Sequence, residues 1–190
     1  MPKKVYIIHK WGGSSTGDWI PWLKEELEAK GIDAVAPDMP DSERPTVEEW
    51  TGFISSAVMS PYEDTYFVGH SISCQAIIRY LSALPENTLC GGAVLVSPWI
   101  KASNLNDDET AIARPWMESP IDFDRAKLHA RKFTVIYSNN DAFVPEANAT
   151  SFGSSLNAKL VMDENKGHFS DDDDVTQLPS ALNELLDIMK

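Results

Sequence analysis

Basic residues and cysteines are scarce in this chain of 190 residues. It has 16 Lys and Arg against 29 Asp and Glu, which gives a formal net charge of −13. Phosphate backbones and anionic lipid surfaces are bound mainly through Lys and Arg, so we expect no nucleic-acid partner and no membrane partner. The negative charge does not indicate which reaction, if any, the protein catalyses, since a charged surface also keeps a protein soluble. With only Cys74 and Cys90, no disulfide framework is indicated.

Long apolar runs are also missing. The apolar residues 5–8 lie between lysines, whereas a secretory signal needs about 7 to 15 apolar residues in a row. No window approaches the roughly 18 apolar residues of a membrane helix. With so few cysteines, these absences predict a cytoplasmic protein.

Short apolar runs alternate with stretches of helical spacing along nearly the whole chain. The predicted strands cover residues 5–9, 32–36, 65–68, 93–97, 133–138 and 159–162. Their near-continuous apolar character is typical of strands that are covered on both faces. Strand–helix alternation over 190 residues predicts one domain, 1–190, of the α/β class: a three-layer α/β/α sandwich around an open parallel sheet.

The predicted helices fill the gaps between these strands. Helical spacing is found over 19–27, 46–58, 74–81, 121–130, 146–152 and 178–186. Thr46 and Glu49 form the pattern of a capping box at the start of the second helix. Residues 99–120 break the alternation, and we expect a loop or partial helix that covers one end of the sheet.

The sequence Gly69-His70-Ser71-Ile72-Ser73 follows an apolar strand and opens a helix. This is the setting of a nucleophile elbow, a strained strand-to-helix turn that raises a serine hydroxyl above the sheet. A tight turn with a capping serine would give the same short pattern. Its position between strand and helix favours the nucleophile. Ser73 departs from the usual G-x-S-x-G pattern.

A serine nucleophile needs a base and an orienting carboxylate, which follow in the order Ser, Asp or Glu, His in α/β-hydrolases. Asp141 comes just after the strand at 133–138, and His168 lies in the loop after the strand at 159–162. Each alone reads equally well as a turn or loop residue. Together, in order and at one edge of the sheet, they predict a catalytic triad of Ser71, Asp141 and His168.

The other histidines fit the role of the base less well. His70 neighbours the nucleophile, and we expect its side chain to point away and to pack. His129 falls at the opposite, amino edge of the sheet. His9 ends the first strand and is the one competitor to His168.

An oxyanion hole completes such a site. We expect one donor to be the backbone N–H of Ile72 and the second that of Trp11, with Lys10 and Gly12 as alternatives. Trp11, Trp99, Trp116, Phe143 and Phe169 are candidates for the substrate pocket, and packing in the core is an equally good interpretation of each.

Patterns that would indicate a cofactor or metal are absent. Neither G-x-G-x-x-G nor G-x-x-x-x-G-K-[ST] occurs, and there is no H-E-x-x-H or Cys/His cluster. We interpret Asp171 to Asp174 as a solvated helix start and Cys74 as a core residue. We therefore expect no cofactor and no metal.

These residues resemble those of the YdeN-like and retinoblastoma-binding serine hydrolases, a family of small α/β-hydrolases. The resemblance runs over nearly the whole chain and is carried by Gly69-His-Ser71, by Asp141-Ala-Phe-Val-Pro145 and by Gly167-His-Phe169. It implies a reduced α/β-hydrolase fold, with about six parallel strands in the order 2-1-3-4-5-6. It also implies weak esterase activity on short acyl esters. Lys10 stands where related proteins often have glycine.

The leading hypothesis is a serine hydrolase of the carboxylesterase type that acts on a small-molecule ester. One alternative is a thioesterase or amidase with the same triad. Another is a binding module with little turnover that holds a protein partner on residues 99–120, for which the sequence offers no further support.

Overall fold

The computed structural model describes residues 2–190 and is built on a six-stranded sheet in the order β2-β1-β3-β4-β5-β6. The strands are β1 (Lys4–Ile8), β2 (Asp33–Val35), β3 (Thr65–His70), β4 (Cys90–Val96), β5 (Ala130–Ser138) and β6 (Lys159–Asp163). Every neighbouring pair runs parallel. The predicted fold class, strand order and six strands are confirmed.

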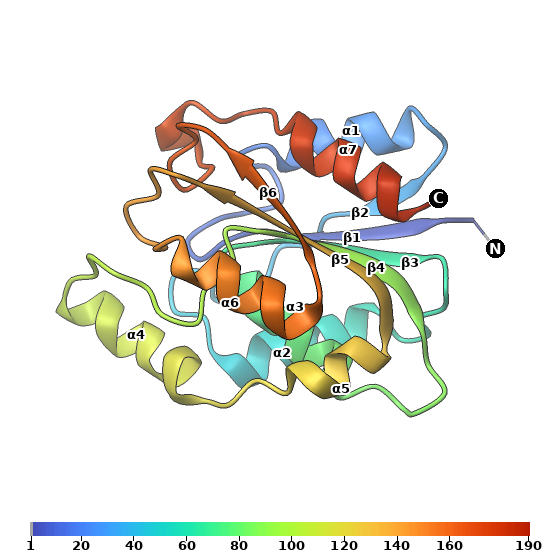
Figure 1. The fold of residues 1–190 in the computed structure, drawn as a ribbon, viewed down its shortest axis with the longest axis horizontal. Helices are drawn as coiled ribbons and strands as arrows, with labels where there is room; N and C mark the ends of the chain where they lie inside the picture. The colour runs from blue at the N-terminus through green and yellow to red at the C-terminus, as the bar shows by residue number, and fades with distance from the viewer. Residues whose placement is uncertain (1) are drawn as a thin grey trace.

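Helices cover both faces of the sheet (Figure 1). One face carries α1 (Ile20–Glu28) and α7 (Pro179–Ile188). The other face carries α2 (Val47–Ala57), α3 (Ile72–Ser82), α5 (Phe123–Leu128) and α6 (Ala147–Leu156). The result is the three-layer arrangement expected of a parallel sheet.

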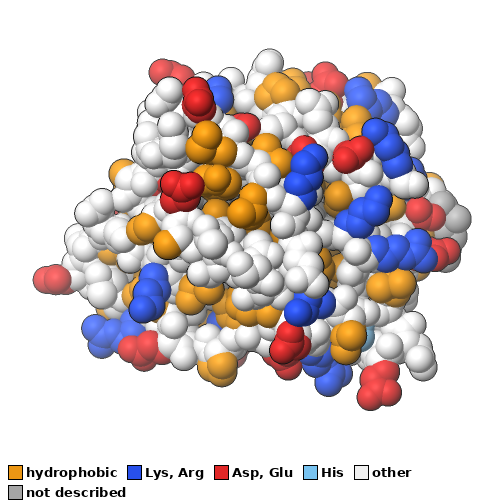
Figure 2. Space-filling model, in the orientation of Figure 1, with side chains coloured by type: hydrophobic (Ala, Val, Ile, Leu, Met, Phe, Trp, Pro, Cys, Tyr) orange, Lys and Arg blue, Asp and Glu red, His pale blue; other side chains and the backbone are white. Residues whose placement is uncertain are grey.

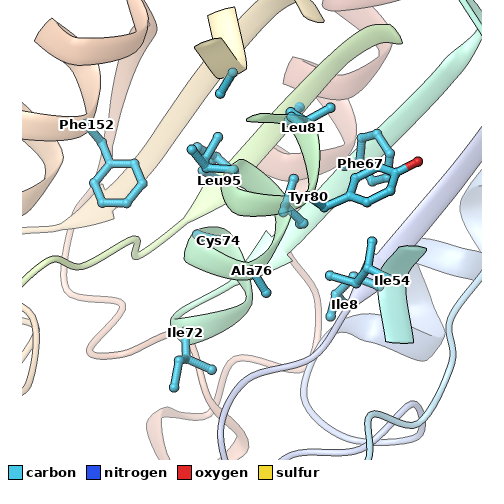
Figure 3. Packing of buried hydrophobic residues seen from close by; sticks show 14 of the residues in the cluster. Ile8, Ile54, Phe67, Ile72, Cys74, Ala76, Tyr80, Leu81, Leu95 and Phe152 are labelled. Carbon is cyan, nitrogen blue, oxygen red and sulfur yellow. The ribbon is translucent and has the colours of Figure 1, made fainter. Parts of the chain in front are cut away.

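The central strands divide their side chains between two apolar cores. On β3, Phe67 packs on the α2–α3 side, whereas Val68 packs on the α1–α7 side. This alternation follows from the two-residue period of a strand. Figure 3 shows the first core, in which Tyr80 of α3 lies beside Phe67 and Ile54 of α2 lies beside Ile8 of β1. The sheet thus forms a rigid platform under the loops at its carboxyl edge.

The predicted cap of α2 is present in a modified form. The Thr46 hydroxyl accepts the Glu49 backbone N–H at 3.2 Å. The Glu49 carboxylate accepts the Thr46 hydroxyl at 2.9 Å, whereas the predicted capping box would have it accept the Thr46 backbone N–H.

Segment 99–120, for which we expected a loop or partial helix, holds the helix α4 (Asp107–Glu118). A reciprocal capping box between Asn106 and Glu109 begins this helix. The signal was present in the sequence as Asn106 three residues before Glu109, but Pro115 in the helix interior obscured it. The helix lies beyond the carboxyl ends of the strands (Figure 1).

The surface mixes charges of both signs. On the face shown in Figure 2, acidic and basic side chains lie close to one another among apolar ones. Within residues 2–190, no helix combines the length and apolarity needed to span a bilayer.

Candidate active site

Ser71 occupies a strained turn between β3 and α3. Its backbone has φ 60° and ψ −121°, a conformation that costs about 1–3 kcal/mol for a residue other than glycine. Gly69 makes the turn sterically feasible, since a Cβ there would lie 2.7 Å from Cδ1 of Ile77. The Ser71 N–H donates to the Val96 carbonyl at 2.8 Å, which ties the elbow to β4. The Ser71 side chain therefore stands at the carboxyl edge of the sheet.

Ser73, which replaces the second glycine of the G-x-S-x-G pattern, has hydrogen-bond partners for its hydroxyl. Its hydroxyl accepts the His70 backbone N–H at 2.7 Å and lies 2.9 Å from the carbonyls of both Ile8 and His70. Because the residue is completely buried, these partners replace the water that the hydroxyl loses. The extra hydroxyl thus ties the elbow to the end of β1.

His168 links Ser71 to Asp141. Its Nε2 lies 2.9 Å from the Ser71 Oγ, and its Nδ1 lies 2.8 Å from Oδ2 of Asp141. An ionised carboxylate can only accept, so Nδ1 carries the proton and Nε2 presents a lone pair to the hydroxyl. The structure therefore brings the three predicted residues together in the geometry of a Ser-His-Asp triad.

Asp141 is held as a buried carboxylate, with 1% of its side chain exposed. Burial opposes ionisation, but hydrogen bonds to His168 and Ser97 and the charge of His168 outweigh it, so the pKa of Asp141 lies below its usual value. Oδ1 accepts the backbone N–H groups of Phe143 and Val144, each at 2.9 Å. The carboxylate is thus ready to hold an imidazolium.

Ser97, to which we assigned no role from the sequence, is a second serine beside His168. Its hydroxyl donates to Oδ2 of Asp141 at 2.5 Å and lies 3.4 Å from the His168 Nδ1. It sits on the carboxylate side of the imidazole, whereas Ser71 faces Nε2 and lines the cavity described below. This placement favours Ser71 as the nucleophile and gives Ser97 the task of orienting Asp141. Its position just after β4 is a sequence signal that points to it.

The loops after β5 and β6 are joined by side chains that the sequence analysis also missed. The Ser138 hydroxyl accepts the Lys166 N–H at 2.9 Å and donates to Asn140, whose Oδ1 accepts the Gly167 N–H at 2.8 Å. These bonds hold the segment of Asp141 beside the segment of His168.

The acidic run 171–174 is more than the solvated helix start that we predicted. Asp171–Asp173 form a 3₁₀ turn, and Oδ2 of Asp173 accepts the His168 backbone N–H at 2.8 Å. Gly167 has φ 51°, and a Cβ at that position would collide with the Asp173 carboxylate. The run therefore anchors the backbone of the proposed base.

The remaining histidines have structural partners. His70 is fully buried, and its Nε2 donates to the His168 carbonyl at 2.8 Å, so it packs as expected and also holds the loop of the proposed base. Burial and the nearby His168 place the pKa of His70 well below its usual value. His9 accepts the Met39 N–H at Nε2 and donates to the Lys10 carbonyl at Nδ1, which removes it as a competitor. His129 precedes β5 at the amino edge, as predicted.

A cavity of about 350 Å³ opens above Ser71. Among the predicted pocket residues, Trp11, Trp99 and Phe143 line it. Trp116 and Phe169 do not, which corrects their assignment. Trp116 is buried in the core on the α2–α3 side, and its indole donates to the Pro45 carbonyl. Phe169 is buried in the core on the α1–α7 side.

Charged side chains surround the same cavity. Lys10, Glu43, Glu109 and Asp172 line it, and the Lys10 ammonium is bound by both oxygens of Asp18, at 2.7 and 3.0 Å. Lys10 therefore fastens the loop after β1 to Asp18.

The structure removes Gly12 from the three candidates for the second donor of the oxyanion hole. The Gly12 N–H already donates to the Ser42 carbonyl at 2.8 Å. Trp11 and Lys10 remain, and the Trp11 indole donates to the Glu43 carbonyl at 2.9 Å, which fixes the loop over the cavity. Ile72 is the first residue of α3, where backbone N–H groups lack intrahelical partners.

The fold and the Ser71–His168–Asp141 geometry are of the kind found in serine hydrolases of the α/β-hydrolase type. The sequence model of the family described as Serine hydrolase matches residues 5–187, and the chain belongs to this family. It is similar to YdeN of Bacillus subtilis (strain 168), at 34% identity over 182 residues that cover 94% of this chain and 92% of that protein. Serine hydrolase RBBP9 of Rattus norvegicus is 28% identical over 171 residues, 88% of each chain.

Solved structures show the same likeness. The crystal structure of the ydeN gene product from B. subtilis has a TM-score of 0.91 at 32% identity and covers 98% of both chains. Est1E from Butyrivibrio proteoclasticus has a TM-score of 0.75 at 17% identity, covering 99% of this chain and 88% of that one, and shares the fold.

Proposed function

We propose that this chain is a serine hydrolase of the carboxylesterase type that cleaves small acyl esters. The observation that carries the proposal is the pair of hydrogen bonds that His168 makes beneath an open cavity, one accepted from Ser71 at 2.9 Å and one donated to Asp141 at 2.8 Å. A volume of about 350 Å³ is at the small end of ligand sites. It suits a short acyl group and a modest leaving alcohol.

The reaction begins when Ser71 attacks the ester carbonyl. Its O–H bond breaks, the proton moves to Nε2 of His168, and the oxygen's electron pair forms the new bond to carbon. The carbonyl π pair moves onto the carbonyl oxygen, which the N–H groups of Ile72 and Trp11 receive. Asp141 stabilises the imidazolium. Collapse expels the alcohol with the proton from His168, and water then hydrolyses the acyl-enzyme by the same steps.

Charge at the cavity limits the substrate. The carboxylates of Glu43, Glu109 and Asp172 line it, and the single cation, Lys10, is bound by Asp18. Close like charges oppose binding, so strongly anionic esters are expected to be poor substrates. Neutral esters fit the aromatic walls better.

Labelling by a fluorophosphonate probe, followed by intact-protein mass, tests the nucleophile. The wild-type chain should gain one adduct, and Ser71→Ala none. Ser97→Ala is the matched control, since it removes the other serine beside His168 and should still be labelled. Equal labelling of Ser71→Ala, or an unlabelled wild type, contradicts the assignment.

A panel of acyl substrates separates the proposal from its alternatives. The wild type should hydrolyse acetyl and butyryl esters faster than octanoyl esters and faster than the matching thioester and anilide. A faster thioester or anilide would change the bond that is cleaved. Labelling without turnover on any substrate would favour a binding module.

A further inference from the structure

The indole N–H of Trp99 points at the same oxygen that attacks the substrate. Its Nε1 lies 3.1 Å from Oγ of Ser71, and the tryptophan is 2% exposed. An indole N–H can only donate, so Ser71 accepts this bond. The Ser71 hydroxyl therefore accepts from Trp99 while it donates to His168, and both contacts converge on one atom.

Trp99 is held in this position by buried polar side chains. Its carbonyl accepts the side-chain N–H of Gln75 at 2.7 Å, and Gln75 is completely buried in α3. Oδ1 of Asn148 accepts the next two backbone N–H groups, of Ile100 and Lys101, at 2.8 and 3.0 Å. Two buried amides from α3 and α6 thus fix the backbone at Trp99 and at the two residues that follow it, as expected of a preorganised donor and beyond the needs of a simple hydrophobic wall.

We propose that Trp99 is a catalytic residue whose indole N–H stabilises the negative charge that develops on the Ser71 Oγ in the transition states in which its proton passes to or from His168 and its bond to carbon is only partly formed. The inference rests on the proposed function and adds a donor that is separate from the oxyanion hole. Hydrogen bonds to charged acceptors are about twice as strong as neutral ones, so the bond from Trp99 strengthens as the oxygen loses its proton.

The charge arises twice in a catalytic cycle. During acylation the Ser71 O–H bond breaks as its proton moves to Nε2 of His168, and the electron pair forms the bond from Oγ to carbon. During deacylation that bond breaks, the pair returns to Oγ, and His168 returns a proton to it. The indole keeps its own proton throughout, and no group is oxidised or reduced.

Replacing the donor while keeping an aromatic wall tests the inference. Trp99→Phe should lower kcat by roughly 10-fold, because the charge-assisted part of one hydrogen bond is lost. The factor should be the same for acetyl and butyryl esters, with KM unchanged or lower. The rate of fluorophosphonate labelling should fall in parallel. Benzothienylalanine at position 99, which exchanges N–H for sulfur at the same shape, should reproduce these effects in a chain with wild-type thermal stability.

Trp50→Phe is the matched control, because it also removes a buried indole N–H, one that donates to the Pro40 carbonyl at 2.8 Å. Its kcat should stay within twofold of wild type. Wild-type kcat and labelling rates in both position-99 variants would overturn the inference and leave the proposed function standing. So would a loss confined to KM that grows with acyl length, which is the behaviour of a wall. An unlabelled wild type would instead reject the proposed function.

Discussion

Asp141 uses its two carboxylate oxygens for different partners. Oδ1 accepts hydrogen bonds from the backbone N–H groups of Phe143 and Val144, whereas Oδ2 accepts hydrogen bonds from the Nδ1–H of His168 and the hydroxyl of Ser97. All four partners are donors, so only a group with acceptors on both sides suits this position. An aspartate is therefore required by the hydrogen bonding alone, apart from its charge.

Asp141→Asn should fold and lose most activity. The amide oxygen would stay with Phe143 and Val144, so the amide nitrogen would face His168 and Ser97 with two further donors. His168 could then bond to it only through an unprotonated Nδ1, which places the imidazole proton on Nε2, toward Ser71. We expect kcat to fall by about 10³ to 10⁴-fold, as for a triad in the wrong tautomer.

Steady-state kinetics on a butyryl ester checks this prediction, with circular dichroism to establish the fold. Asp172→Asn is the matched change at an exposed carboxylate that lines the cavity without contacting His168. It should leave the kcat for a neutral ester far closer to wild type than Asp141→Asn does. Turnover by Asp141→Asn near the wild-type rate would point to another acid.

At the scale of elements, local sequence patterns predicted the strands and the elbow better than they predicted the contacts of the loops. The apolar runs of β3 and β4 and the turn at Gly69 sufficed to place Ser71, because strand ends define where an elbow can lie. Trp116 and Phe169 were misassigned because aromatic character does not say on which side of an element a side chain falls. The roles of Ser97 and Asp173 were missed because they depend on contacts that no pattern predicts: Ser97 bonds to Asp141 in another loop, and Asp173 folds back onto the backbone of His168 in its own loop.

The elbow is held by the hydrogen bonds of the Ser73 hydroxyl to His70 and to the end of β1. Ser73→Ala would remove the acceptor of the buried His70 N–H and the donor shared by the carbonyls of Ile8 and His70. An unsatisfied buried group costs about 1–3 kcal/mol, so we expect the free energy of unfolding to fall by that amount. Urea unfolding measures it. Ser56→Ala, at an exposed helix position, should change it by less than about 0.5 kcal/mol. An unchanged midpoint for Ser73→Ala would mean that the hydroxyl does not stabilise the elbow.

For the whole molecule, the acidic balance and the buried histidines act in opposite directions as pH falls. The net charge of −13 diminishes toward the pI of about 4.6, which relieves repulsion among carboxylates. Burial lowers the pKa values of His70 and His9, so the folded chain binds fewer protons there than the unfolded chain does. The histidines therefore favour the folded state at high pH.

His70 provides the sharper test of this opposition. Burial, and to a lesser extent His168 and Lys10, lower the pKa of His70. The Nε2 bond to the His168 carbonyl and the carboxylate of Asp141 raise it, but by less. The carboxylate of Asp18 lies 3.7 Å from Nδ1 of His70. Because its pKa is depressed in the folded state, its contribution is complete above the unfolded value of about 6.5 and is lost as pH falls below it. The slope approaches about 1.4 kcal/mol per pH unit for this one histidine.

Urea unfolding at pH 7.5, 6.5 and 5.5, on wild type and on His70→Gln, isolates this contribution. Glutamine keeps an N–H donor for the His168 carbonyl but does not titrate. The variant should be less stable than wild type at pH 7.5, and the difference should shrink toward pH 5.5. Relief of carboxylate repulsion and the titration of His9 are common to both chains, so they cancel in the difference. A difference that is constant across the three pH values would show that His70 is not kept neutral by the fold.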